Sequence, residues 1–177
     1  MSQLKVNSIV PVAGVPTGGG GGIIQVKSVN KTDVFSVTAS SGSFSDITGL
    51  SVSITPTTNT SKILIYFQSN YSAAINQRGS FRLLRGSTVI NAAGADGNST
   101  NEAIFAGLCT RTNNAESIPV AGVFLDSPTT ASAVTYKLQV GAENSAGTIY
   151  VNRTQEGATG TSHFLGVSNL VVQEVSA

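Results

Sequence analysis

Hydrophobic and polar side chains alternate along most of this 177-residue chain, in short runs that turn-forming residues separate. A period of two is typical of β-strands, because successive side chains of a strand point to opposite faces of the sheet. Many of the runs are also rich in Val, Ile and Thr, which favour strands. The pattern predicts strands over residues 23–29, 34–38, 50–55, 62–69, 80–85, 103–110, 118–125, 134–140, 148–151 and 164–175.

Turn-forming residues lie between these runs, as in Ser-Ser-Gly at 40–42, Pro-Thr-Thr-Asn at 56–59 and Asp-Ser-Pro at 126–128. No segment shows the apolar 3.6-residue period and the caps of a helix. About ten short strands without helices are typical of an antiparallel two-sheet sandwich. We therefore predict an all-β sandwich, of jelly-roll kind, with a closed barrel as the alternative.

Residues 62–69 are apolar on both faces of the predicted strand, with Ile63, Ile65 and Phe67 on one side and Leu64 and Tyr66 on the other. A strand of this kind belongs to a sheet that is covered on both faces. One cover is the core of the chain, and we expect the other to be a sister subunit. Closed cyclic symmetry is usual for such chains, and a homotrimer is the specific prediction.

The first 22 residues differ from all that follow. Pro11, Pro16 and five consecutive glycines exclude a helix there, because proline lacks an amide donor and glycine loses the most backbone entropy on ordering. We predict an extended N-terminal arm at 1–22, with a pentaglycine hinge, before a β-sandwich domain at 23–177. The candidate anchoring residues of the arm are Leu4, Val6, Ile9, Val10 and Val12, and the hinge is Gly18, Gly19, Gly20, Gly21 and Gly22.

Charged residues make up only 11% of the chain and hydrophobic residues 40%, whereas roughly 25% charged residues is usual for a soluble domain. Subunit interfaces are depleted in Lys, Glu and Asp, so this composition favours an assembled protein over a monomer with a hydroxyl-rich surface. The net charge of +1 without a basic run argues against a nucleic-acid partner. No apolar stretch is long enough to insert into a membrane, and residues 1–22 lack the pattern of a signal peptide.

Residues that carry chemistry are few and scattered. His163 and Cys109 are each the only residue of their type, the nine acidic residues form no close cluster, and the glycine run is not followed by Lys-Ser or Lys-Thr. Metal sites need three or four convergent ligands, and a phosphate loop needs that lysine. We therefore expect no metal, no cofactor and no enzymatic activity. Glycosidase acids can lie far apart in sequence, so a polysaccharide depolymerase stays the least favoured alternative.

Four residues are candidates for a subunit interface: Arg78, Arg82, Tyr66 and Tyr136. In a strand, Arg78 and Arg82 share one face, and Arg85 shares the other with Phe81 and Leu83. These arginines are interpreted first as a solvated edge or a rim salt bridge. The alternative is that they pair with an acid such as Asp126 or Glu116 across an interface, or contact an acidic partner. For the tyrosines, buried or interfacial packing is favoured over carbohydrate stacking.

Several segments together resemble a known group of proteins. They are SQLKVNSIVPVAGVPTGGGGGIIQ at the start, then DITGLSVSITP, SKILIYF, FRLLRGSTVI, FLDSPTTASAVTYKLQV and IYVNRT. The chain resembles small virion structural and tail-fibre-like proteins of marine bacteriophages, especially those of cyanobacteria. The most specific parts are the LKVNSIVP arm and the FLDSP to TYKLQ hairpin. The strand signature is similar to trimeric jelly rolls of the tumour-necrosis-factor-like type, and the resemblance brings no catalytic residues.

The resemblance implies a virion structural protein, made in the host cytoplasm and placed on the surface of the phage head or tail. We expect the arm to anchor it to other virion proteins, with the sandwich displayed as a head decoration, short fibre or knob. The alternative is a tail-fibre tip that recognises host surface glycan through loops near residues 91–101, 113–117 and 152–161.

Overall fold

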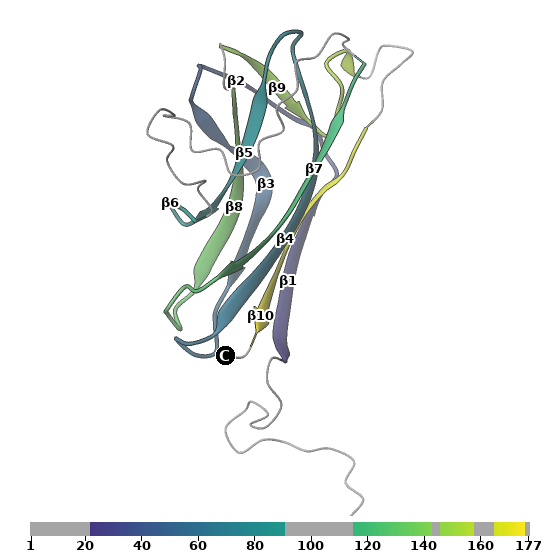
Figure 1. Cartoon of the computed structure of the whole chain (residues 1–177). Coiled ribbons are helices and arrows are strands. Elements are labelled where there is room, and N and C mark those ends of the chain that lie inside the picture. The colour runs from purple at the N-terminus through teal and green to yellow at the C-terminus, as the bar shows by residue number, and fades with distance from the viewer. Residues whose placement is uncertain (1–21, 91–114, 143–145, 158–164, 176–177) are drawn as a thin grey trace, which may run out of the picture.

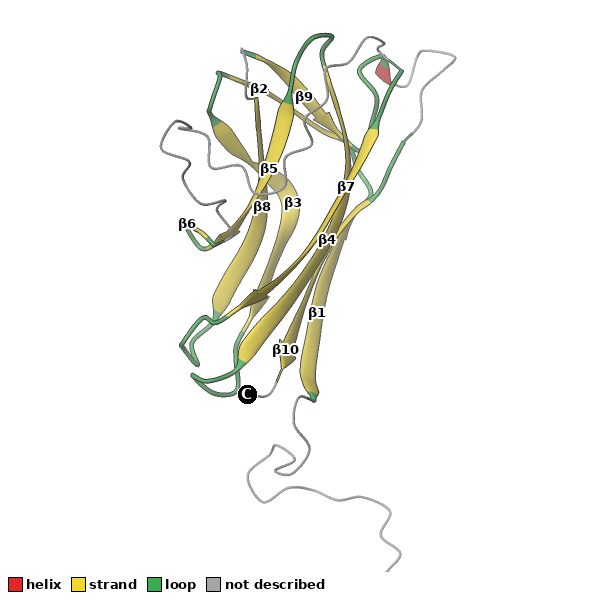
Figure 2. Ribbon diagram, viewed as in Figure 1, coloured by secondary structure: helices red, strands yellow, loops and turns green. Residues whose placement is uncertain are grey.

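The structure is a computed structural model that describes residues 22–90, 115–142, 146–157 and 165–175. Within these ranges the regular structure is β-strand, and no α-helix is present. Figures 1 and 2 show two facing layers of long strands. The strands are β1 (Ile23–Lys31), β2 (Phe35–Ala39), β3 (Phe44–Ile54), β4 (Lys62–Ala73), β5 (Gly79–Arg85), β6 (Thr88–Val89), β7 (Ile118–Asp126), β8 (Val134–Ala142), β9 (Gly147–Val151) and β10 (Ser168–Val175).

All strand pairs are antiparallel and belong to two sheets. The first sheet has the order β1-β10-β4-β9-β2, with β7 also paired to β4, and the second has the order β3-β8-β5-β6. Tyr71 of β4 pairs with Ile118 of β7 and with Val151 of β9, so β7 and β9 border opposite edges of β4. β10 pairs with the part of β4 that β7 also borders, so β10 and β9 follow one another along the same edge of β4.

β1 and β2 follow one another in the same way, since β1 pairs with β10 and β2 pairs with β9. If β1 and β2 are counted as one interrupted strand, and β9 and β10 as another, the ten strands become eight. Their order is then 1-8-3-6 in the first sheet and 2-7-4-5 in the second, which is the strand order of a jelly roll. The predicted antiparallel sandwich of jelly-roll kind is therefore confirmed, and the two separate sheets exclude the closed barrel.

Asn152 directly follows β9 and stabilises the place where the β1–β2 strand and the β9–β10 strand are both interrupted. It is fully buried, with a φ of 61°, a backbone conformation that asparagine tolerates better than most residues. Its Nδ2 donates hydrogen bonds to the carbonyl oxygens of Lys31 at 2.9 Å and Asp33 at 3.1 Å, and Ser168 Oγ donates to its Oδ1 at 2.6 Å. Its backbone N–H donates to the carbonyl of Asn70 at 2.9 Å. Through its side chain and its backbone N–H, Asn152 thus joins β1, β4 and β10.

The core lies between the sheets, as the alternation predicts for Ile63, Ile65 and Phe67, which are all buried. Tyr71 and Phe81 meet across the sandwich edge to face, with ring centroids 5.4 Å apart. The cluster that fills the space comprises Ala39, Ile47, Leu50, Val52, Ile54, Ile63, Ile65, Phe67, Tyr71, Ala73, Phe81, Leu83, Val120, Tyr136, Leu138, Val140, Ala142, Ile149, Val151, Leu170 and Val172.

Differences from the predicted strands occur where the alternation is interrupted. β3 begins at Phe44, six residues before the predicted start at Leu50, and its pairing with β8 shifts between Asp46 and Ser51. Such a bulge breaks the period of two, which hid the first half of the strand. The two-residue β6 was not predicted, and β10 begins at Ser168 rather than at 164. The predicted strand at 103–110 and residues 1–21 of the arm lie outside the described residues.

Candidate assembly surface

The outward face of the first sheet can be read from the pairing of its strands. Residues that pair across antiparallel strands have their side chains on the same face. Ile63, Ile65 and Phe67 of β4 face the core, so Leu64 and Tyr66 between them face outward. Two rows of outward side chains follow across the sheet: Val26, Gln173, Leu64 and Leu125, and next to it Ser28, Val171, Tyr66 and Val123.

This outward face exposes large apolar side chains. Val123 is 59% exposed, Leu125 49% and Tyr66 37% on β4 and β7, and Val26 is 51% exposed on β1. Antiparallel sheets with one face in water normally alternate hydrophobic side chains inward with polar side chains outward. Contiguous exposed apolar patches mark interaction sites in soluble proteins. The face therefore has the character of a contact surface, and we call it the apolar face.

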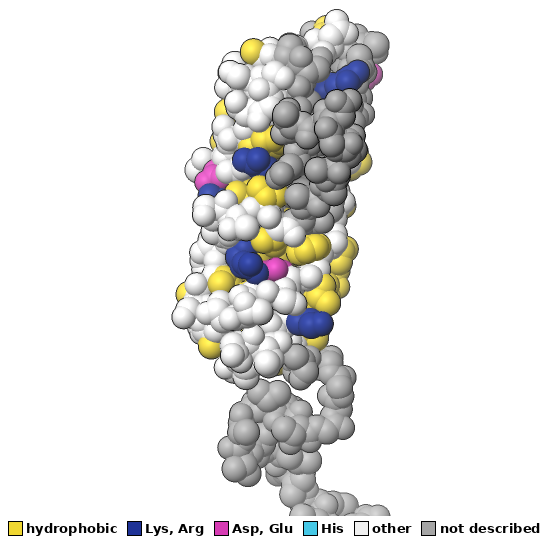
Figure 3. Space-filling view, turned by 60° about the vertical axis from the view of Figure 1, so that its left-hand side comes forward, with side chains coloured by type: hydrophobic (Ala, Val, Ile, Leu, Met, Phe, Trp, Pro, Cys, Tyr) yellow, Lys and Arg dark blue, Asp and Glu magenta, His cyan; other side chains and the backbone are white. Residues whose placement is uncertain are grey.

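Charge is nearly absent from the apolar face. Among the outward positions of β1, β10, β4 and β7, which are described over their whole lengths, Lys62 is the only charged residue. The acid of β10, Glu174, points into the sandwich and is fully buried. Figure 3 shows, on another side of the molecule, a few Lys, Arg and acidic side chains scattered among uncharged polar and hydrophobic ones.

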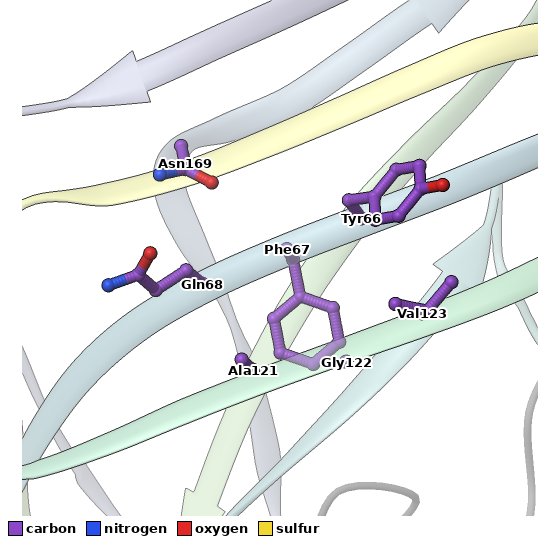
Figure 4. A pocket seen from close by; sticks show the side chains of 7 residues that line it. All are labelled: Tyr66, Phe67, Gln68, Ala121, Gly122, Val123 and Asn169. Atoms are coloured by element: carbon purple, nitrogen blue, oxygen red, sulfur yellow. The ribbon is translucent and has the colours of Figure 1, made fainter.

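A hollow of about 500 Å³ lies on the first sheet where β10, β4 and β7 run side by side. Phe67 and its partner Gly122 present only backbone at this place, because the side chain of Phe67 faces the core. Figure 4 shows Tyr66 and Val123 to one side of Phe67, and Gln68 and Ala121 to the other. The lining residues are Tyr66, Phe67, Gln68, Ala121, Gly122, Val123 and Asn169. They include no ionisable side chain other than the Tyr66 phenol, so the hollow suits an uncharged group.

The four predicted interface residues do not come together in the structure. Tyr66 lies on the apolar face, whereas Tyr136 is fully buried in the core of the chain itself. Arg78 is exposed just before β5 begins. Arg82 lies on the second sheet, where its guanidinium stacks 4.1 Å from the centre of the Phe44 ring and its Nε donates to Gln139 at 2.7 Å. Of the four, only Tyr66 belongs to the apolar face.

Arg85 is the arginine that pairs with Asp126, and it does so within one chain. Its Nη1 donates to the two carboxylate oxygens of Asp126 at 3.0 and 2.9 Å. The hydroxyl of Tyr136 donates to the same carboxylate at 2.7 Å, and burial, together with this acidic neighbour, raises the pKa of Tyr136. Asp126 ends β7 in the first sheet, while Arg85 and Tyr136 lie in the second. The cluster therefore joins the two sheets. Asp126 is one of the two acids predicted as partners for the arginines, but the ion pair with Arg85 lies within the chain and not between subunits.

Glu174 forms a second internal tie, near the start of β1. It accepts hydrogen bonds from Gln25 Nε2 at 2.5 Å, from the backbone N–H of Thr57 at 2.6 Å and from the Thr57 hydroxyl. Burial by itself would raise the pKa of Glu174, but the hydrogen bonds from Gln25, Thr57 and Ser61 outweigh it and hold the pKa below its usual value. The charged form is thus built into the fold, where it joins β1, β10 and the loop before β4.

Sequence reasoning missed the outward residues of β7 and β1, namely Val123, Leu125, Val26 and Ile23. Residues 118–125 are apolar on both faces, just as residues 62–69 are, and this signal could have marked β7 as part of the same doubly apolar sheet. The glycan-loop alternative loses one of its residues, because Asn152 is buried. The loops at 91–101 and 158–161 lie outside the described residues.

The described part of the chain offers no metal site. No three His, Cys, Asp or Glu side chains gather there in a way that could hold a metal ion. The described residues also contain no helix able to span a membrane. Cys109 and His163 lie outside them.

No protein-family model matches the chain. No curated protein matches its sequence either. Solved structures of infectious bursal disease virus resemble it weakly, at 15% sequence identity in each case. The Gt strain has a TM-score of 0.42, with 86% of this chain and 38% of that chain covered. The Gx strain also has a TM-score of 0.42, with 97% and 44% covered.

A crystal structure of the VP2 subviral particle of the same virus has a TM-score of 0.37, with 85% of this chain and 41% of that chain covered. The chain thus spans less than half the length of each of these proteins. The jelly-roll assignment rests on the strand order of the chain itself.

Proposed function

We propose that this chain is a non-enzymatic structural protein of a bacteriophage particle, displayed on the surface of the head or tail. The observation that carries the proposal is the apolar face. A jelly roll whose outward sheet surface exposes large apolar side chains among uncharged polar ones, with Lys62 as the one charge among the outward positions of β1, β10, β4 and β7, is suited to burial in an assembly. The low overall charge of 11% agrees with the same role.

The arm would supply the attachment to other virion proteins. β1 starts at Ile23, directly after the glycine run, and pairs there with Val175 near the end of β10. Residues 1–22 are therefore joined to one end of the elongated sandwich, marked by the C label in Figure 1. Anchoring at that end would leave the opposite end, with the loops between β4 and β5 and after β9, to face outward.

Attachment by a short apolar segment has a physical basis. Leu4, Val6, Ile9, Val10 and Val12 would each gain from burial against a neighbouring protein, since burying such a side chain contributes about 1.5–3 kcal/mol. The glycines that follow would let the sandwich take its own orientation relative to the anchor. The proposal thus assigns attachment to the arm and lateral packing to the sandwich.

The test is quantitative mass spectrometry of purified particles from the phage that encodes the chain, compared with particles made from a gene that lacks codons 2–17. We expect a fixed copy number per wild-type particle and loss of the protein from the deletion particles. Absence from wild-type particles would refute the structural role, whereas equal incorporation of the deletion variant would refute only the anchoring role of the arm.

A further inference from the structure

No part of the chain that the structure describes covers Val123, Leu125 or Val26 on the apolar face, and the chemistry of the face narrows the choice of partner. We propose that a second copy of this chain covers the face, with the hollow beside Tyr66 receiving an uncharged side chain of that copy. This inference rests on the proposed function as an assembly protein, and it adds which surface the copies share.

The size of the apolar face suits a contact between copies. It spans four strands, of which β7 has nine residues. With about 4.8 Å between strands and about 3.3 Å per residue, the face measures about 600 Å². A stable interface buries about 800 Å² on each partner, so the face supplies most of that area. The borders of the sheet would supply the rest.

The lack of charge favours a copy of the same chain over a different protein. Interfaces between unlike proteins commonly gain specificity from opposite charges on the two partners. Lys62, at one end of β4, is the only charge among the outward positions of the four strands. One charge at the end of a strand gives little basis for selecting an acidic or a basic partner. An apolar surface is complementary to another copy of itself, as the surfaces of symmetric oligomers are.

The two free borders of this sheet differ in a way that agrees with the inference. β1 carries the exposed Lys27 and has a bulge near Ile23, and both are common devices against strand-to-strand association. β7 pairs with β4 over nine residue pairs without a bulge, and its only charge, Asp126, is bound by Arg85. The protection of the β7 border is confined to Pro119 near the start of the strand. The apolar face reaches this border over the rest of β7, as expected if a neighbouring copy lies there.

The experiment measures the mass in solution of the full-length chain by sedimentation velocity and light scattering at several concentrations. The variant is the double substitution Val123→Lys and Leu125→Lys, which places two charges on the apolar face. The matched control places two lysines on the outward face of the second sheet, at Ser53 and Thr135, an exposed pair joined by a 2.7 Å hydrogen bond. Circular dichroism establishes that each variant keeps its β-structure.

We expect the wild-type chain and the control to form the same oligomer, with a mass two or three times the 18.1 kDa of the chain. A dimer means that the face meets itself, and a trimer means that it meets another surface of the next copy. We expect the face variant to be monomeric, with self-association weakened about 100-fold or more, because a lysine without a partner is strongly disfavoured in a buried interface.

A wild-type chain that stays monomeric at every concentration would overturn the inference, and so would a face variant that keeps the oligomer. If the lysine variant does not fold, self-association is measured with Val123→Thr instead. Threonine has nearly the same side-chain shape as valine, so this substitution removes only apolar contact. We expect it to weaken self-association by about tenfold. A monomer that is nevertheless present in particles would refute the shared surface alone, and an oligomer absent from particles would refute the proposed function alone.

Discussion

Replacing Glu174 by glutamine tests whether its buried charge stabilises the fold. The side chain is fully buried and accepts three hydrogen bonds, from Gln25 and from the amide and hydroxyl of Thr57. A hydrogen bond to a charged group contributes about 1.5–3 kcal/mol, against about 0.5–1.5 kcal/mol for a neutral one. With glutamine, each of the three hydrogen bonds contributes about 1 kcal/mol less, which amounts to about 3 kcal/mol in total. Glutamine also avoids the cost of burying a charge, and this offsets part of the loss. We expect Glu174→Gln to lower the free energy of unfolding by about 2 kcal/mol near neutral pH.

The same tie predicts how stability depends on pH. The pKa of Glu174 is lower in the folded chain than in the unfolded chain, where glutamate has a pKa of about 4.3. Its contribution is therefore fully present above that unfolded pKa, and it is lost as the pH falls through the folded pKa. We expect the wild-type chain to lose stability below about pH 4, and the glutamine variant to lose less over the same range.

The assay is urea unfolding followed by circular dichroism, near neutral pH and below pH 4, with the free energy taken from the midpoint and slope. The matched control is Glu156→Gln, the same chemical change at an exposed position. We expect this control to unfold as the wild type does. The reasoning would be refuted if both glutamine variants matched the wild type at neutral pH, or if Glu174→Gln left the acid-induced loss unchanged.

Substitutions at three further positions test the internal structure, each by urea unfolding. We expect Asn152→Ala to lose about 3 kcal/mol, from its hydrogen bonds and from the strain of alanine at a φ of 61°. Asn152→Gly should lose less, because glycine adopts that φ freely, and an equal loss would contradict the strain. Tyr136→Phe should lose about 1–2 kcal/mol, since it removes a donor from buried Asp126. Gly141→Ala should lose about 1–3 kcal/mol, because its Cβ would lie 2.4 Å from the carbonyl oxygen of Ser43; unchanged stability would mean that this contact relaxes.

The sandwich was predictable because its pattern is local. Ile63, Ile65 and Phe67 alternate with their neighbours, and the structure places all three in the core. The doubly apolar character of the same segment also led to the expectation of a second cover, and Tyr66 lies on the outward face as that expectation requires. These features follow from the period of two within a single strand.

The internal ties were not predictable, because they depend on which strands become neighbours. Arg85 and Asp126 lie 41 residues apart, and Glu174 and Thr57 lie 117 apart. The sequence pattern does not reveal that a glutamate in an alternating strand points inward, since burial of a charge depends on donors that other strands supply. Tyr136 was expected in buried or interfacial packing, and the sequence did not separate the two, because the register that turns Tyr136 toward Asp126 is set by the whole sheet.

If this chain is a structural part of a phage particle, another subunit covers its apolar face there. A cryo-electron microscopy reconstruction of the intact particle would show whether this is so. We predict density for the sandwich on the head or tail surface, with the outward side of β1, β10, β4 and β7 in contact with another protein subunit and Val123 buried. Density that leaves this face in solvent, or particles with no density for the chain, would contradict the account.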